Sequence, residues 1–188
     1  MPDVLSEALA AARAIQDESN RAKALSALAD KLPPELLPEA LTAARAIQDE
    51  STRVYALSAL ADKLPEVLLE ALAAAKALQD ELSRAEALTA LANKLPEVLP
   101  EALTAAFAIQ FEFHRAKALT ALANKLAQMP ILQLFPLWQD ALHTLSLRSR
   151  KDVLADIKAL VPVIFMLGGE AAIGEVAGAI GDVARWWR

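Results

Sequence analysis

The chain has 188 residues, of which 55% are hydrophobic but only 5% aromatic, and a formal net charge of −5. This length supports one sizeable hydrophobic core, and the absence of cysteine excludes disulfides and thiolate metal sites. Residues 1–126 carry 18 acidic and 13 basic side chains, and residues 127–188 carry 6 of each. Neither part has the basic excess that contact with many phosphates requires, so we expect no nucleic-acid partner.

The composition favours an all-α fold. Most of the apolar residues are Ala and Leu, which are strong helix formers, and all 5 glycines come after residue 167. No segment alternates apolar and polar residues as a half-buried strand does. The longest apolar run, 159–169, is shorter than the roughly 20 residues that a bilayer span needs. We therefore expect a cytoplasmic chain with no membrane partner and no leader segment.

A unit of about 31 residues recurs four times and reads approximately PEVLPEALTAARAIQDES, followed by RA, AL and ALADKL. The four copies begin at Pro2, Pro34, Pro65 and Pro96. Apolar residues recur at helical spacing in both halves of the unit, which predicts two helices per copy. In the second copy we expect a first helix from about Pro38 to Glu50, and a second helix with Ser51 as its N-cap.

Because a unit of two short helices cannot bury its own apolar face, the copies are expected to stack on one another. The sequence thus predicts a right-handed α-solenoid, similar in shape to tetratricopeptide or HEAT repeats. Residues 1–129 form the four repeats, and residues 130–188 form a degenerate fifth repeat and capping helices of the same continuous domain. Ser149 in that fifth repeat mirrors Ser83. Four bulky residues are expected to close the core: Phe135, Trp138, Trp186 and Trp187.

The repeat unit contains AARAIQDE, RA, AL, ALA and KLP, and the C-terminal stretch ends in ARWW. Both resemble the helical repeats of large multidomain bacterial proteins. In that family, the repeats follow a NACHT or NB-ARC signal-transduction ATPase of the STAND class, or a similar effector module. The resemblance implies that this chain acts as a sensor or scaffold region. It implies no nucleotide hydrolysis, because the chain contains no G-x-x-x-x-G-K-[ST] motif.

Three polar columns are identical in all four copies. They are Gln16, Gln48, Gln79 and Gln110; Glu18, Glu50, Glu81 and Glu112; and Arg21, Arg53, Arg84 and Arg115. A polar groove for an anion is one interpretation. We favour a structural ladder that satisfies backbone groups at the turn between the two helices, because helix ends leave such groups unpaired and one ligand rarely needs four copies of a residue.

The fourth copy departs from the others by replacing charged residues with aromatic ones. In the first three copies, Arg13 with Asp17, Arg45 with Asp49 and Lys76 with Asp80 have the spacing of exposed i,i+4 ion pairs. The fourth copy has Phe107 and Phe111 at these two positions, followed by Phe113 and His114.

Two explanations for these aromatic residues remain open. Either the C-terminal segment folds back and covers them, or they form an exposed patch. Such a patch could dock a partner protein, a second copy of the chain as in a homodimer, or a small apolar ligand. Tyr55 is a further candidate contact.

No arrangement of residues indicates an enzyme, a cofactor or a metal site. Asp140, His143 and Ser146 lie on one predicted helix without an oxyanion donor, so they do not form a triad. We interpret the chain as a non-enzymatic binding module, the sensor or scaffold part of a larger signalling protein. The alternatives are an engineered or consensus-derived repeat scaffold that self-assembles and, as a second alternative, an unrecognised enzyme.

Overall fold

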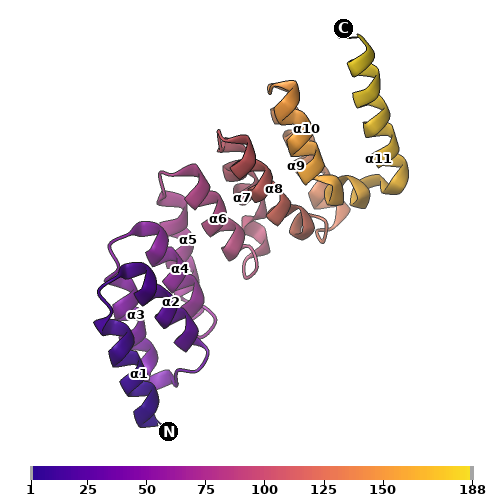
Figure 1. Ribbon diagram of the computed structural model, residues 1–188. Coiled ribbons are helices and arrows are strands. Elements are labelled where there is room, and N and C mark those ends of the chain that lie inside the picture. Colours follow the sequence, from indigo (N-terminus) through magenta and orange to yellow (C-terminus); the bar gives the residue numbers. More distant parts are fainter. Residues whose placement is uncertain (1, 187–188) are drawn as a thin grey trace. The chain divides into compact units, whose positions relative to one another are not determined.

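The computed structural model describes the backbone of residues 2–186 and the side chains of residues 4–182, and that part of the chain is helical without any strand. The all-α prediction is therefore confirmed. The helices divide into two compact units, one ending at Val98 and one starting at Leu99 (Figure 1). The fourth repeat thus belongs to the C-terminal unit, whereas the sequence groups it with the first three.

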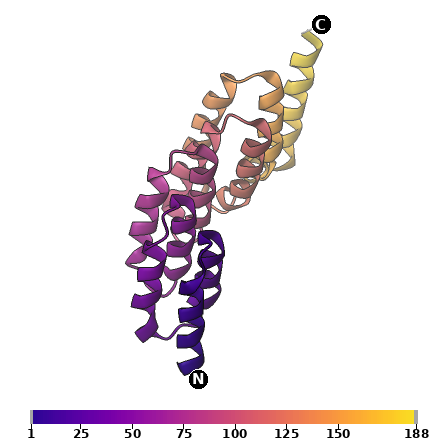
Figure 2. The same cartoon turned by 60° about the vertical axis from the view of Figure 1, so that its left-hand side comes forward.

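The N-terminal unit contains three helix pairs, one for each of the first three repeats (Figure 2). They are α1 (Pro2–Ala14) with α2 (Glu18–Ala29), α3 (Leu37–Arg45) with α4 (Glu50–Leu60), and α5 (Val67–Ala77) with α6 (Glu81–Leu91). Two 3-10 turns, η1 (Pro34–Leu36) and η2 (Pro96–Val98), belong to the connections that follow α2 and α6. Helix α4 packs against α2, α5 and α6, so neighbouring repeats share their apolar faces.

Alanine and leucine fill the core between these helices. Leu25, Ile47 and Leu60 are fully buried, and so are Ala40 and Ala75 on the first helices of their repeats. Small side chains on α3 and α5 let the neighbouring helices approach closely, and the leucines supply most of the buried apolar area. Burial of such a side chain stabilises the fold by roughly 1.5–3 kcal/mol.

The predicted boundaries between the two helices of a repeat are wrong by several residues. In the second copy, the first helix ends at Arg45 rather than near Glu50. The N-cap of the second helix is Asp49 rather than Ser51, because the Asp49 carboxylate accepts a hydrogen bond of 2.7 Å from the Thr52 amide. Asp17 and Asp80 cap α2 and α6 in the same way.

Up to residue 186, the C-terminal unit contains five helices. They are α7 (Leu99–Ala108), α8 (Glu112–Leu126), α9 (Ile131–Ser146), α10 (Arg150–Ala159) and α11 (Val161–Trp186). Helix α8 packs against α7, α10 and α11. The residues of the predicted fifth repeat form the two helices α9 and α10. Ser149 is the N-cap of α10, so it takes the structural place of Asp80 rather than that of Ser83.

Helix α11 is interrupted by Gly168 and Gly169, and Gly169 has a φ of 63°. The segment Val161–Asp182 is long and apolar enough to cross a membrane by length and composition, and 11% of its most apolar window is buried. Core helices of soluble proteins that share such a composition are mostly buried, unlike this window, but Glu170 and Glu175 lie within this segment. The expected absence of a membrane partner therefore stays a prediction.

Of the residues predicted to close the core, Trp138 is half-buried, whereas Phe135 is 52% exposed. The Trp186 and Trp187 side chains lie outside the described residues.

Candidate functional site

The glutamines and arginines that recur in all four repeats lie at the turn between the two helices. Each glutamine side chain donates to the carbonyl two residues before it, and each arginine Nη1 donates to the carbonyl six residues before it. The glutamine acceptors are Ala14, Ala46, Ala77 and Ala108, and the arginine acceptors are Ile15, Ile47, Leu78 and Ile109. These bonds satisfy carbonyl groups that the end of the first helix leaves free.

Two members of the glutamate column, Glu18 and Glu112, make contacts beyond their own repeat. Glu18 accepts hydrogen bonds from the Gln48 and Asp49 amides of the next repeat, at 2.9 and 2.8 Å. These two bonds lower the pKa of Glu18 below its ordinary value. In the fourth copy, Glu112 instead forms an ion pair of 2.6 Å with Lys151.

The predicted i,i+4 ion pairs are wrong for the first two copies. Arg13 pairs with Glu39, and Arg45 pairs with Glu70 at 2.6 Å, so both arginines bind the following repeat. The reason is geometric: Asp17 and Asp49 lie past the end of the first helix, where they cap the second one.

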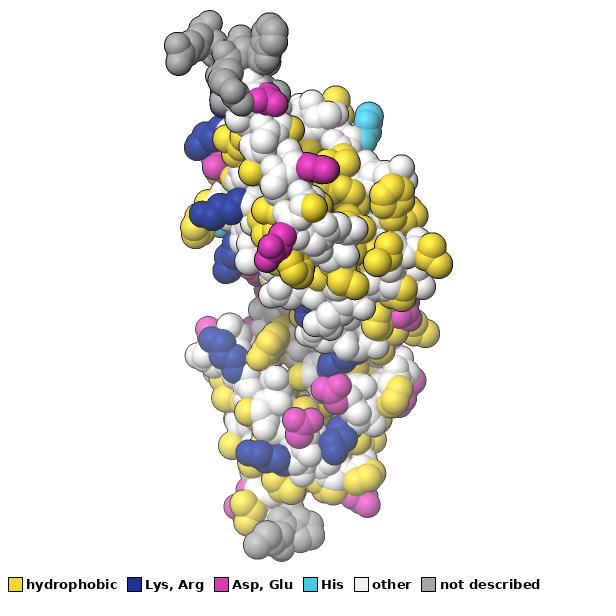
Figure 3. All heavy atoms as spheres, turned by 90° about the vertical axis from the view of Figure 1, so that its right-hand side faces the viewer, with side chains coloured by type: hydrophobic (Ala, Val, Ile, Leu, Met, Phe, Trp, Pro, Cys, Tyr) yellow, Lys and Arg dark blue, Asp and Glu magenta, His cyan; other side chains and the backbone are white. Residues whose placement is uncertain are grey.

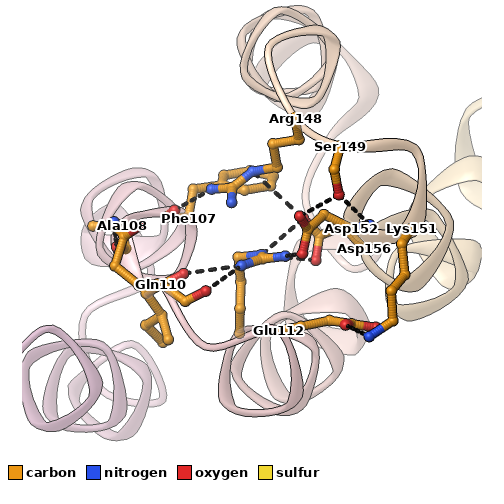
Figure 4. A network of polar contacts seen from close by, with 11 residues as sticks. Phe107, Ala108, Gln110, Glu112, Arg148, Ser149, Lys151, Asp152 and Asp156 are labelled. Atoms are coloured by element: carbon orange, nitrogen blue, oxygen red, sulfur yellow. Dashed lines mark hydrogen bonds and ion pairs between the residues drawn. The ribbon is translucent and has the colours of Figure 1, made fainter.

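In the fourth repeat, the recurring arginine, Arg115, belongs to a buried network of charges (Figure 4). Arg115 is 1% exposed and Asp156 is fully buried. Arg115 Nε lies 2.9 Å from both Asp156 carboxylate oxygens, and Arg115 Nη2 lies 2.6 Å from Asp152 Oδ1. Burial raises the pKa of Asp156, and the Arg115 guanidinium opposes that rise. The network therefore ties α8 to α10.

Phe107 is covered, which decides between the two explanations for this residue. It is 8% exposed, the Arg148 guanidinium carbon lies 5.8 Å from its ring centroid, and Arg148 also donates to the Phe107 carbonyl. The prediction that Phe107 and Phe111 share an exposed helical face is therefore wrong. Helix α7 ends at Ala108, and Phe111 lies beyond it in the turn before α8.

Phe111, Phe113 and His114 form what we call the aromatic cluster, at the start of α8. Phe111 and Phe113 are both 76% exposed. The His114 ring lies between them, with centroid distances of 6.1 Å to Phe111 and 5.7 Å to Phe113. Phe111 is the N-cap of α8 but makes no capping hydrogen bond, unlike the aspartates at this position in the first three repeats. The two phenyl rings of the cluster are therefore left unburied, and α8 has no side-chain N-cap.

A groove of about 730 Å³ lies between α8 and α10, next to the aromatic cluster. We call it the basic groove, because three lysines line it and Glu112 is its only acidic lining residue. Its lining residues are Glu112, Phe113, Ala116, Lys117, Thr120, Lys151, Ala155, Lys158 and Ala159. Phe113 belongs to both features, so the cluster and the groove form one continuous surface.

Comparisons with protein-family models, with curated protein sequences and with solved structures find no match. The surface can bind an extended or helical segment, because both walls are helices and three alanines keep the wall side chains short.

A second apolar surface lies on α9, and we call it the α9 stripe. Its members are Ile131, Leu132, Phe135 and Leu142, which are 50%, 90%, 52% and 45% exposed. The neighbouring face of α9 carries the buried Leu134, Ala141 and Leu145. In the space-filling view, hydrophobic side chains gather at the height where Figure 1 shows α9 and α11 (Figure 3).

Other candidate residues fall outside these two surfaces. Tyr55 is 52% exposed on α4, in the N-terminal unit. The Ser146 hydroxyl donates to the backbone carbonyl of His143 at 2.6 Å rather than to its imidazole. The lysines of the basic groove and the buried Asp156 were not predicted from the sequence.

Proposed function

We propose that this chain is a non-enzymatic binding module built as a right-handed α-solenoid, and that it recognises a partner protein through the aromatic cluster. Packing of α4 against α2 and α6, and ion pairs from one repeat to the next, support the solenoid arrangement. The resemblance to repeats of STAND proteins supports a place in a larger signalling protein, as its sensor or scaffold part.

One observation carries the binding role. Phe111 replaces an aspartate cap whose loss typically costs about 1 kcal/mol of stability. The exposed phenyl ring also forgoes burial worth roughly 1.5–3 kcal/mol. The His114 ring contacts offset only part of these two costs, because Phe111 and Phe113 both stay 76% exposed. A partner that covers both rings would recover the burial free energy.

The test is a selection from a peptide library displayed on phage, with the full chain as the immobilised target. The key variant, F111D/F113S/H114N, restores the residues that the first repeat has at these positions. V4S/L69S is the matched control, because it removes two exposed apolar side chains (67% and 69% exposed) from the N-terminal unit.

We expect selected peptides to bind the wild type and the control alike, and the reverted variant at least about tenfold more weakly, or about 1.4 kcal/mol. Circular dichroism verifies that all three chains have the same helicity. Recovery of no binding peptide, or of peptides that bind all three chains equally, would exclude the proposed role of the cluster.

Self-association is a second candidate function, and the α9 stripe favours it. A helix with apolar residues on both faces is usually buried on both, yet Leu132 is 90% exposed. If two copies pair through this stripe, light scattering should show a molar mass that rises with concentration. The L132K/F135K variant should then stay monomeric, and a wild type that is monomeric at all concentrations would rule out this candidate.

A further inference from the structure

The two walls of the basic groove each present one face of a helix. On α8 the lining residues Phe113, Ala116, Lys117 and Thr120 follow the spacing i, i+3, i+4, i+7, and on α10 Lys151, Ala155 and Lys158 follow i, i+4, i+7. Such spacing aligns side chains along a helix. The lining face of α8 is therefore about 10 Å long, with alanines on both walls and lysines on both walls.

The charge of this surface contrasts with that of the remaining chain. Up to Val98 the chain carries 16 acidic and 10 basic side chains, a net charge of −6, whereas from Leu99 it carries 8 and 9, a net charge of +1. The groove itself has three lysines and one glutamate. Lys151 already pairs with Glu112 at 2.6 Å, and the Lys151 side chain is 81% exposed.

We propose that the basic groove binds an acidic segment of a partner protein, with an apolar side chain of that segment packed against Phe113. This inference rests on the proposed function and names the chemistry of its ligand. Carboxylates of the ligand would lie near Lys117, Lys151 and Lys158, which line both sides of the groove. The alanines let the backbone of the ligand approach, and the aromatic cluster receives its apolar anchor.

A protein segment fits this surface better than a nucleic acid does. Nucleic-acid binding usually neutralises many phosphates, and its affinity depends on that number. The groove offers three lysines within a chain of net charge −5. The apolar part of the lining, Phe113 with its neighbouring alanines, is suited to an aliphatic or aromatic side chain.

The experiment uses the peptides selected on the full chain, resynthesised with a fluorescent label and titrated by fluorescence polarisation. The groove variant is K117Q/K151Q/K158Q. The matched control, K23Q/K31Q/K63Q, removes the same charge from exposed positions of the N-terminal unit. A version of each peptide with Gln and Asn in place of Glu and Asp tests the ligand charge.

We expect the selected peptides to be enriched in Asp and Glu. Their affinity should fall about tenfold or more for the groove variant or for the neutral peptide, and stay within about twofold for the control variant. The dependence of affinity on salt concentration should be smaller for the groove variant, because fewer ionic contacts remain.

Three results would overturn the inference. They are selected peptides without acidic enrichment, equal losses in the groove and control variants, and a single-stranded oligonucleotide that binds the groove as tightly as the peptides. If peptides without acidic residues still depend on Phe111, Phe113 and His114, the proposed function stands and the inference about ligand charge fails. If the reverted variant of the cluster binds every selected peptide like the wild type, the proposed function itself fails.

Discussion

Arg115 Nε lies 2.9 Å from both carboxylate oxygens of Asp156, a residue 41 positions later in the chain. Both side chains are buried, and D156L would leave the Arg115 guanidinium with only the partly exposed Asp152 as its charge partner. We expect D156L to lower the free energy of unfolding by about 3 kcal/mol, the lower end for a broken buried ion pair, because Asp152 still compensates part of the Arg115 charge. The R115M/D156L double variant should lose much less than the sum of the two single variants, because it removes both buried charges.

Tryptophan fluorescence in a urea titration reports the unfolding of the C-terminal unit, because all 3 tryptophans come after Leu99. K151M is the control, because Lys151 forms an exposed ion pair with Glu112 in the same unit and should change stability by about 1 kcal/mol or less. Additive losses in the double variant would contradict the role of Arg115 and Asp156 as a coupled pair.

Glu18 should make the stability of the N-terminal unit depend on pH. Backbone amides of Gln48 and Asp49 lower the pKa of Glu18 below its ordinary 4.5. A lowered pKa contributes stability that is present above the unfolded value and is lost as the pH falls through the folded value. The difference in stability between the wild type and E18Q should therefore be largest near neutral pH and shrink in acid.

Urea titrations followed by far-UV circular dichroism at several pH values measure this difference. S19A serves as the control, since Ser19 is exposed and does not titrate. A difference between wild type and E18Q that stays constant from neutral pH down to acid would exclude a pH-linked contact between these repeats.

The sequence predicts the helices of this chain better than their ends. Periodic Leu and Ala residues indicate both helices of each repeat, because burial of one face decides their formation. The turn is harder to place, since Asp49 and Ser51 are both good N-cap residues. Only the geometry shows that Asp49 accepts the Thr52 amide at 2.7 Å.

The candidate site depends on contacts that the sequence does not reveal. Phe107 and Phe111 look equivalent as replacements for charged residues, yet one is 8% and the other 76% exposed. Phe107 lies on α7, next to Arg148 and to a cavity that it shares with α9, whereas Phe111 lies past the end of α7 in the turn before α8. The burial of Asp156 could have been predicted from its spacing. Ala159 follows it by three residues and Leu160 by four, which places Asp156 on the apolar, buried face of α10.

Phe111 offers a test of stability that is separate from binding. F111D should restore an N-cap to α8 and raise the free energy of unfolding by about 1 kcal/mol, as measured by tryptophan fluorescence in urea. F113S removes an equally exposed phenyl ring without adding a cap, so it should change stability by less than about 0.5 kcal/mol. If both variants lower stability alike, the phenyl rings are packed within the chain rather than exposed.

Gly169 should be required for the bend in α11. It has φ 63° and ψ −156°, a conformation that side-chain-bearing residues adopt only at a cost of about 1–3 kcal/mol. We expect G169A to lower the free energy of unfolding by that amount, although no atom lies within 4 Å of the added methyl group. G174A is the matched control, because Gly174 is helical and equally unobstructed, so alanine there should raise stability by roughly 0.5–1 kcal/mol. If the free energy of unfolding falls in G169A and rises in G174A, the difference reflects the backbone conformation at the two positions. A stabilising G169A would mean that α11 runs through this position as a continuous helix, which would also turn the buried Val163 and Ile164 relative to the later turns of the helix.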